Sequence, residues 1–158
     1  MAEMNGEYIN AFLVAASSVM QTACGITLTA GQPYVKTTAF DTSAVVICLG
    51  VTGQIGGQVL IAAHKEVACD LASKMCMMPI LQLDEISLSA LSELGNMILG
   101  NAATVLSTKN VMIDITPPMI IQGDFKMDRV YARNICLPMQ YDDGKVIEID
   151  VSLTEARS

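Results

Sequence analysis

The spacing of apolar residues predicts three helices. Apolar side chains recur every three or four positions over residues 5–24 and again over residues 64–78, which is the period of an amphipathic helix. Asp84 is a good N-cap for a third helix, because its side chain can accept a hydrogen bond from a backbone N–H of the first turn. The apolar pattern carries this third helix to about Ser107.

Strand-like segments separate and follow these helices. The first, over residues 26–36, contains Pro33 and therefore suits a sheet edge or a bend. The others are predicted at 44–51, 54–63, 111–116, 119–122, 130–140 and 147–153. In the last segment apolar and polar residues alternate, which predicts one buried face and one face in contact with water. Strands that hairpins can join favour an α+β fold, a largely antiparallel sheet with three helices packed against it, in a single domain of residues 1–158.

A weak internal two-fold repeat accompanies this order. Each half contains a helix, then a strand interrupted by proline, then a hairpin. A shift of 86 positions lays Glu7 and Asn10 over Glu93 and Asn96. Isolated matches of this kind arise by chance, so two matched residues do not by themselves establish a repeat.

The third helix has two unlike faces. Its core stripe consists of Leu91, Leu94, Ile98, Ala102 and Val105. Its opposite face holds small residues with one acid and one amide: Ser89, Glu93, Asn96, Gly100, Ala103 and Ser107. Exposed helix positions usually hold long polar residues, and Gly100 costs ~1 kcal/mol relative to alanine in mid-helix. The small face therefore predicts close approach, either by another molecule or by a helix of the same protein or of a second copy.

Composition narrows the class of protein. Of the 158 residues 52% are hydrophobic and 16% are charged, which excludes an intrinsically disordered chain. No apolar run approaches the ~18 residues of a membrane-spanning helix. The net charge of −7 and the lack of a Lys/Arg cluster argue against nucleic acid and anionic membranes as partners. Acidic residues precede the first apolar stretch, so we expect no secretory signal and a cytoplasmic protein.

The cysteines and the histidine offer little for a metal site. The five cysteines are odd in number, contain no Cys-x-x-Cys pair and suit reduced core positions. One histidine without paired cysteines leaves no set of zinc ligands. We therefore expect no metal bound by this chain.

One run on the third helix resembles a known signature. Residues 92–102, Ser-Glu-Leu-Gly-Asn-Met-Ile-Leu-Gly-Asn-Ala, resemble the signature helix of the CheC/CheX/FliY phosphatases of bacterial chemotaxis, in which Glu-x-x-Asn precedes small residues. Residues 8–12 resemble the start of the CheX members, with Ala11 where those have proline. The order of helices and strands fits CheX along nearly the whole chain.

The CheX resemblance implies a protein phosphatase, a hydrolase of two-component signalling in chemotaxis. It implies that the substrate is the aspartyl phosphate of a CheY-type response-regulator receiver, and that the chain forms a homodimer with one active motif per chain. The implied catalytic residues are Glu93 and Asn96. It implies no cofactor of the chain's own, because the receiver brings its Mg²⁺ and its lysine.

The chemistry of a water-assisted hydrolysis suits this pair. Metal and lysine neutralise the phosphoryl charge, so the missing contribution is a water held in line with the bond that breaks. Asn96 is the better candidate for orienting that water, because a neutral amide accepts from water and is not repelled by phosphate. Glu93, one turn earlier, can pair with the receiver's lysine and fix the register. The residues expected to contact the receiver are Ser92, Gly100, Ala103 and Ser107.

Two other functions stay open. The chain can be a non-catalytic adaptor or flagellar-switch module that binds the receiver, or a structural dimer whose small-residue helix face is its own interface. A sheet edge near residues 127–140 is a candidate for strand pairing across a dimer. We expect Glu7 and Asn10 to be non-catalytic, because Val14 stands where the other helix has Gly100.

Overall fold

The computed structural model describes residues 6–35, 38–127 and 134–155. Its helices are α1 (Gly6–Val19), continued by the short π-helical segment η1 (Met20–Cys24), α2 (Lys65–Cys76) and α3 (Glu85–Ser107). Its strands are β1 (Thr29–Ala30), β2 (Tyr34–Val35), β3 (Thr38–Phe40), β4 (Ala44–Gly53), β5 (Ile55–His64), β6 (Ile113–Ile115), β7 (Met119–Gln122), β8 (Phe125–Met127), β9 (Ile135–Tyr141) and β10 (Lys145–Glu155). The three predicted helices are confirmed.

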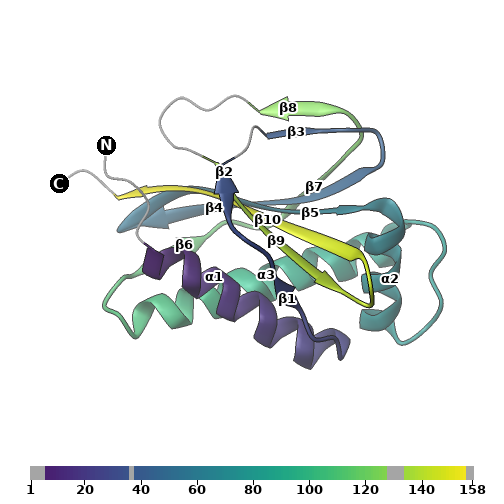
Figure 1. The fold of residues 1–158 in the computed structure, drawn as a ribbon, viewed down its shortest axis with the longest axis horizontal. Helices are drawn as coiled ribbons and strands as arrows, with labels where there is room; N and C mark the ends of the chain where they lie inside the picture. Colours follow the sequence, from purple (N-terminus) through teal and green to yellow (C-terminus); the bar gives the residue numbers. More distant parts are fainter. Residues whose placement is uncertain (1–5, 36–37, 128–133, 156–158) are drawn as a thin grey trace.

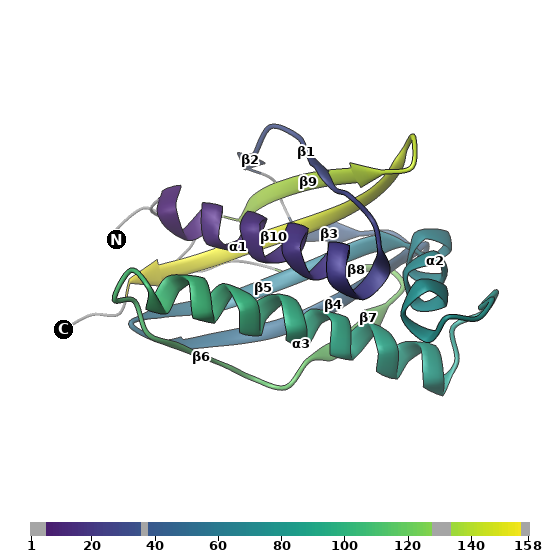
Figure 2. The same cartoon turned by 90° about the horizontal axis from the view of Figure 1, so that it is seen from below.

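The strands form one large sheet and one small ribbon. The large sheet has the order β1-β9-β10-β5-β4-β6, with β2 also paired to β9 and β7 to β4, and these pairs are antiparallel. The small ribbon is the pair β3–β8. Helices α1 and α3 lie side by side on one face of the sheet and run in opposite directions, while the ribbon lies on the other face (Figures 1 and 2). The predicted α+β architecture is therefore confirmed.

The main core lies between the helices and the large sheet. Phe12 of α1, Leu49 of β4 and Ile98 of α3 are almost fully buried there. Gly95 lets α3 approach β4, because a Cβ at this position would lie only 2.8 Å from Ile47 Cγ2. This close approach fixes the rotation of α3, so its opposite side faces solvent.

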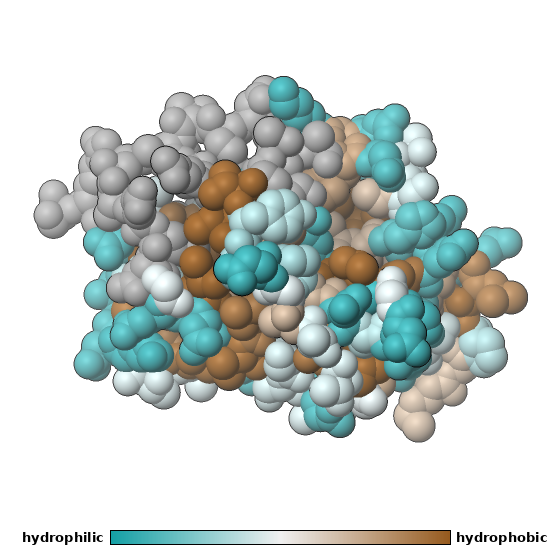
Figure 3. Space-filling view, in the orientation of Figure 1, coloured by the Kyte–Doolittle hydropathy of each residue, from teal (hydrophilic) through white to brown (hydrophobic). Residues whose placement is uncertain are grey.

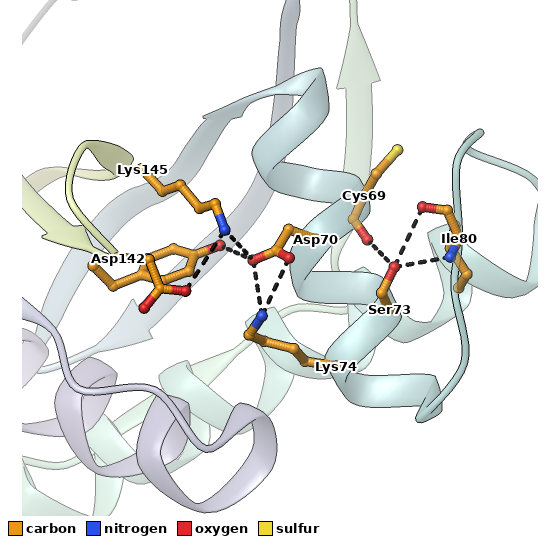
Figure 4. A network of polar contacts seen from close by, with 8 residues as sticks. Cys69, Asp70, Ser73, Lys74, Ile80, Asp142 and Lys145 are labelled. Carbon is orange, nitrogen blue, oxygen red and sulfur yellow. Dashed lines mark hydrogen bonds and ion pairs between the residues drawn. The ribbon is translucent and has the colours of Figure 1, made fainter.

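A polar network fastens α2 to the hairpin of β9 and β10 (Figure 4). The Tyr141 hydroxyl donates to Asp70 Oδ2 at 2.6 Å, and the ammonium groups of Lys74 and Lys145 lie 3.1 and 3.6 Å from the same oxygen. Burial raises the pKa of Asp70, but the hydrogen bonds from Tyr141 and Lys74 and the lysine charges outweigh it and hold that pKa below its ordinary value. Burial and the Asp70 contact raise the pKa of Tyr141. Asp70 therefore stays ionised and Tyr141 protonated around neutral pH.

The segment over residues 26–36 differs from the prediction of one strand. It forms two short strands, β1 and β2, and both pair with β9. The predicted free edge at residues 127–140 is therefore wrong, because the chain's own strands cover β9 and β8 pairs with β3. Residues 128–133 of that range lie outside the described residues.

The last strand differs from the prediction on its outer face. Its alternation is correct for the helix-covered face, but Asp150 and Ser152 on the other face are buried instead of wet. Further along this outer face the β3–β8 ribbon packs over Leu60, with Phe40 stacked on Phe125 at a centroid distance of 5.0 Å. Since β3 and β8 are distant in sequence, no local pattern predicts the second layer.

Two further expectations concern the chain as a whole. None of the helices described is long and apolar enough to span a lipid bilayer. The internal repeat stays a prediction.

Candidate functional site

A capping box fixes where α3 begins. The Asp84 carboxylate accepts a hydrogen bond from the Ser87 backbone N–H at 2.9 Å, and the Ser87 hydroxyl oxygen accepts one from the Asp84 N–H at 2.7 Å. The hydrogen bond from the Ser87 backbone, followed by that from its hydroxyl, lowers the pKa of Asp84. The predicted N-cap is confirmed. A fixed start and a fixed buried side together determine which residues of α3 face outward.

Glu93 and Asn96 lie on this outward side, and both side chains are exposed. Three residues of helix separate them by about 4.5 Å along the axis and about 60° around it, so they emerge next to each other. Within the described part of the chain, neither side chain makes a hydrogen bond or ion pair. An acid and an amide that their own protein leaves unengaged can bind another molecule.

A groove of about 430 Å³ runs beside this pair. One wall is α3 and the other is the start of β7 with the turn before it; the lining residues are Glu85, Leu88, Ser89, Ser92, Glu93, Asn96, Pro118 and Ile120. The turn is anchored to β4, because Gly50 N–H donates to Thr116 Oγ1 at 2.8 Å and Thr116 N–H donates to the Gly50 carbonyl at 3.0 Å. These two hydrogen bonds fix the position of this wall relative to the sheet.

The predicted contact residues fall into two groups. Ser92 lines the groove with the acid–amide pair, whereas Gly100, Ala103 and Ser107 continue along α3 beyond it and are half-buried. The Ser107 hydroxyl is already used, since it donates to the Thr104 carbonyl at 2.7 Å. These three residues have small side chains, so they form a flat stretch of helix surface with few polar groups to offer. We call these three residues the low surface.

Neither packing within the chain nor the backbone conformation requires glycine at position 100. A Cβ built there would meet no atom within 4 Å, and its φ is not in the left-handed region. Gly95, on the buried side of the same helix, has the opposite character, because its missing Cβ is what admits Ile47. Internal packing therefore explains Gly95 and leaves Gly100 unexplained.

Sequence reasoning missed the second wall of the groove. Pro118 and Ile120 are distant from α3 along the chain, and their strand was predicted without a position relative to the helix. The available signal was the proline pair at 117–118, which marks a turn between two strands. Leu88 was missed because it lies at the margin between the core stripe and the exposed face.

Comparison with known families decides the assignment. The model of the family described as "Chemotaxis phosphatase CheX" matches residues 45–140. The chain belongs to the CheX family. The predicted resemblance and the predicted enzyme class, a phosphatase, are therefore confirmed.

Individual CheX proteins agree with this assignment. The CheY-P phosphatase CheX of Thermotoga maritima is 32% identical over 121 residues, which cover 76% of this chain and 78% of that protein. The CheX–CheY–BeF3–Mg²⁺ complex from Borrelia burgdorferi contains a chain 31% identical, with a TM-score of 0.78 over 94% of this chain and 98% of that one. CheX from Vibrio vulnificus, at 20% identity and a TM-score of 0.82, covers 94% and 99% and shows the shared fold.

The second Glu-x-x-Asn pair of this CheX-family chain lies on α1. Glu7 and Asn10 are exposed, as Glu93 and Asn96 are, so exposure does not distinguish the two pairs. The residue one turn beyond does: Val14 is 45% exposed and projects its branched side chain, where α3 has Gly100. The α1 pair therefore lacks the low surface that follows the α3 pair.

One group of described residues has the spacing of a metal site. It consists of Cys136, Glu148 and Asp150, whose ligand atoms lie within 4.8 Å of one another on the sheet face opposite α3. Burial raises the pKa of the Cys136 thiol, which disfavours the thiolate that metals bind. Glu148 and Asp150 also have other interactions within the protein. We assign no metal to this group.

Proposed function

We propose that this chain hydrolyses the aspartyl phosphate of a CheY-type receiver by placing Glu93 and Asn96 of α3 against the phosphorylation site. The observation that carries the proposal is the exposed, unengaged acid–amide pair beside a groove, in a member of a phosphatase family. The relative from Thermotoga maritima is named a CheY-P phosphatase, and the relative from Borrelia burgdorferi forms a complex with CheY. These two proteins support the choice of a CheY-type receiver as the partner.

Asn96 orients the attacking water. Its amide oxygen accepts a hydrogen bond from the water, and its NH₂ group is not repelled by the phosphoryl oxygens. The water oxygen bonds to phosphorus while the bond from phosphorus to the aspartyl oxygen breaks. Inorganic phosphate leaves, the carboxylate of the receiver's aspartate is restored, and the proton of the water passes to solvent. Positioning alone can supply a large rate effect, since ~1 Å of misplacement can cost 10²-fold.

Glu93 fixes the register of the complex. A carboxylate aimed at a phosphoryl group would be repelled, so its partner is a cation, the lysine beside the receiver's phosphorylation site. Since Glu93 precedes Asn96 by one turn, an ion pair at Glu93 sets where the amide lies along the phosphorus–oxygen bond. Ser92 in the groove and the low surface of Gly100, Ala103 and Ser107 contact the receiver around this ion pair.

The metal of the reaction belongs to the receiver. The complex from Borrelia burgdorferi contains Mg²⁺ and BeF3, and BeF3 stands in for the phosphoryl group. We propose the same arrangement here, with Mg²⁺ neutralising the phosphoryl charge and no cofactor held by this chain.

The proposal extends to the state of the protein. Buried residues from Ala11 to Leu153 share one core, which supports a single domain over residues 1–158. A homodimer in the cytoplasm is proposed from the family resemblance. Sedimentation of the purified protein tests the oligomeric state.

Phosphate release from a phosphorylated receiver with Mg²⁺ tests the function. We expect the wild-type protein to accelerate release, and Glu93→Ala to raise KM about tenfold, the loss of one charged contact. Glu7→Ala is the matched control and leaves kcat and KM unchanged. Binding of the receiver without faster release would support the adaptor function instead, and absence of binding would support the structural dimer.

A further inference from the structure

The N-terminal end of α3 exposes apolar side chains that the catalytic pair does not use. Met77 and Leu81 are each 91% exposed, Ile86 is 67% exposed and Met78 is 56% exposed. All four fall within ten consecutive positions, in the connection from α2 to α3 and the first turn of α3. We call these four residues the apolar end. Single exposed apolar residues are ordinary, but a cluster of four indicates a contact surface.

The apolar end is held in place from beneath. The Ser73 hydroxyl accepts a hydrogen bond from Ile80 N–H at 2.9 Å and donates to the Cys69 carbonyl at 2.7 Å, which ties the connection to α2 (Figure 4). Ile80 and Leu83 pack against the main core. Leu81, between them, is almost fully exposed, so the anchored backbone of the connection presents its side chain to solvent.

Met77 occupies a position that usually belongs to glycine. It ends α2 in the left-handed conformation, with φ 55°, and its backbone N–H bonds to the Ser73 carbonyl. A non-glycine residue is disfavoured there. Its side chain is almost fully exposed, so packing within the folded chain does not offset this cost.

Ile86, the member of the apolar end that lies on α3, shares one row of the helix with Glu93. Ile86 precedes Glu93 by seven residues, which places it about 10 Å further along α3 and within about 20° around the axis. Glu85, the neighbour of Ile86, lines the same groove as Asn96. One row of α3 therefore presents an apolar side chain, then the acid, then the low surface at Gly100.

We propose that the apolar end docks an apolar patch on the same receiver whose phosphoryl group meets Asn96, and so sets the affinity of the complex. This inference rests on the proposed function. A stable contact needs roughly 800 Å² and 20 residues on each partner, which the eight residues lining the groove cannot supply. The apolar end adds to that surface at the N-terminal end of α3 and in the connection before it.

Charge selects the receiver over a second copy of this chain as the occupant. Glu85 and Glu93 bracket Ile86, so the partner must bring cations beside its apolar patch. Two copies meeting at this surface would place their acids together, and each chain already carries a net charge of −7. A receiver with lysine at its phosphorylation site brings the required cation and avoids the repulsion between two acidic copies.

Steady-state phosphate release at varied concentrations of phosphorylated CheY tests this inference. The variants are Ile86→Gln on α3 and Leu81→Ser in the connection, with Val14→Gln as the control, since Val14 is also a branched, exposed residue on a helix. We expect the double variant I86Q/L81S to raise KM about tenfold with kcat unchanged. We expect the control to match the wild-type protein, and thermal unfolding to stay the same in all variants.

The outcomes separate this inference from the proposed function. If the wild-type protein releases no phosphate, the proposed function fails; the inference then fails with it. If the wild-type protein is active but the double variant keeps its KM, only the apolar end is wrong. Loss of a dimer on sedimentation with KM unchanged would show that a second copy covers this surface and would also overturn the inference. Binding to CheY loaded with BeF3 and Mg²⁺ gives an independent reading, with an expected tenfold weaker Kd.

Discussion

Helices α1 and α3 carry the same Glu-x-x-Asn spacing on exposed faces, but their surroundings differ. Beyond Asn96, α3 continues with Gly100, above which a Cβ would find open space, and a groove lies alongside. Beyond Asn10, α1 continues with Val14, whose side chain projects to solvent. We therefore propose that the surface beyond each pair decides whether a partner can approach, and that the Glu-x-x-Asn spacing by itself does not make a site.

The largest expected effect comes from giving α3 the side chain of α1. We expect Gly100→Val to reduce kcat/KM for the phosphorylated receiver by about 100-fold, because the branched side chain displaces the docked surface by ~1 Å or more. The fold is retained, since the added Cβ meets no neighbouring atom. Phosphate release and circular dichroism measure the two effects. The reciprocal change Val14→Gly leaves activity at the wild-type level; loss of activity there would show that both helices contribute.

A smaller effect separates the two glycines within α3. We expect Gly95→Val to lower the free energy of unfolding by about 1–3 kcal/mol, because its side chain must displace Ile47. Gly100→Ala raises it by up to about 1 kcal/mol, since alanine is the better helix former and finds open space. Urea unfolding measures both. Equal changes in the two variants would contradict the assignment of Gly95 to packing and Gly100 to docking.

An effect on stability without an effect on activity is expected in a region remote from both pairs. We expect Tyr141→Phe to lower the free energy of unfolding by about 1–2 kcal/mol, because Asp70 loses its shortest hydrogen bond. Phosphatase activity is unchanged, which makes this variant a control for effects of stability alone. An activity loss in Tyr141→Phe would mean that reduced stability accounts for losses in the other variants.

The same network gives a pH dependence with a definite sign. The pKa of Asp70 is lower in the folded state, so its contribution is present above about pH 4 and is lost as the pH falls through the folded-state value. The pKa of Tyr141 is raised, so its contribution is lost as the pH rises above about 10. Urea unfolding across pH should show both losses in the wild-type protein. Tyr141→Phe should show a smaller loss at both ends of the pH range, because the raised pKa values of Cys24 and Tyr34 still contribute to the alkaline loss.

Local patterns predicted much of the fold. The three helices, the cap at Asp84 and the antiparallel hairpins follow from periodicity and turn residues, which act over a few positions. The β3–β8 ribbon does not, because Phe40 and Phe125 are far apart in the sequence and are brought together only by the tertiary fold. The burial of Asp150 was missed for the same reason, since alternation along β10 reports the helix side and nothing about a second layer.

The candidate site divides in the same way. The outward placement of Glu93 and Asn96 follows from helical period and could be predicted. The opposite wall at Pro118 and Ile120 could not, because it depends on the pairing of β7 with β4. The apolar end at Leu81 and Ile86 was also missed, because exposure of apolar residues in a connection has no periodic signal.

The role of Asn96 is tested by comparing Asn96→Ala with Asn10→Ala at a saturating concentration of phosphorylated receiver. We expect Asn96→Ala to lower kcat by about 10² or more while the Kd for CheY loaded with BeF3 and Mg²⁺ stays the same, and we expect Asn10→Ala to change neither. An Asn96→Ala protein that releases phosphate at the wild-type rate would contradict the claim that this amide holds the attacking water.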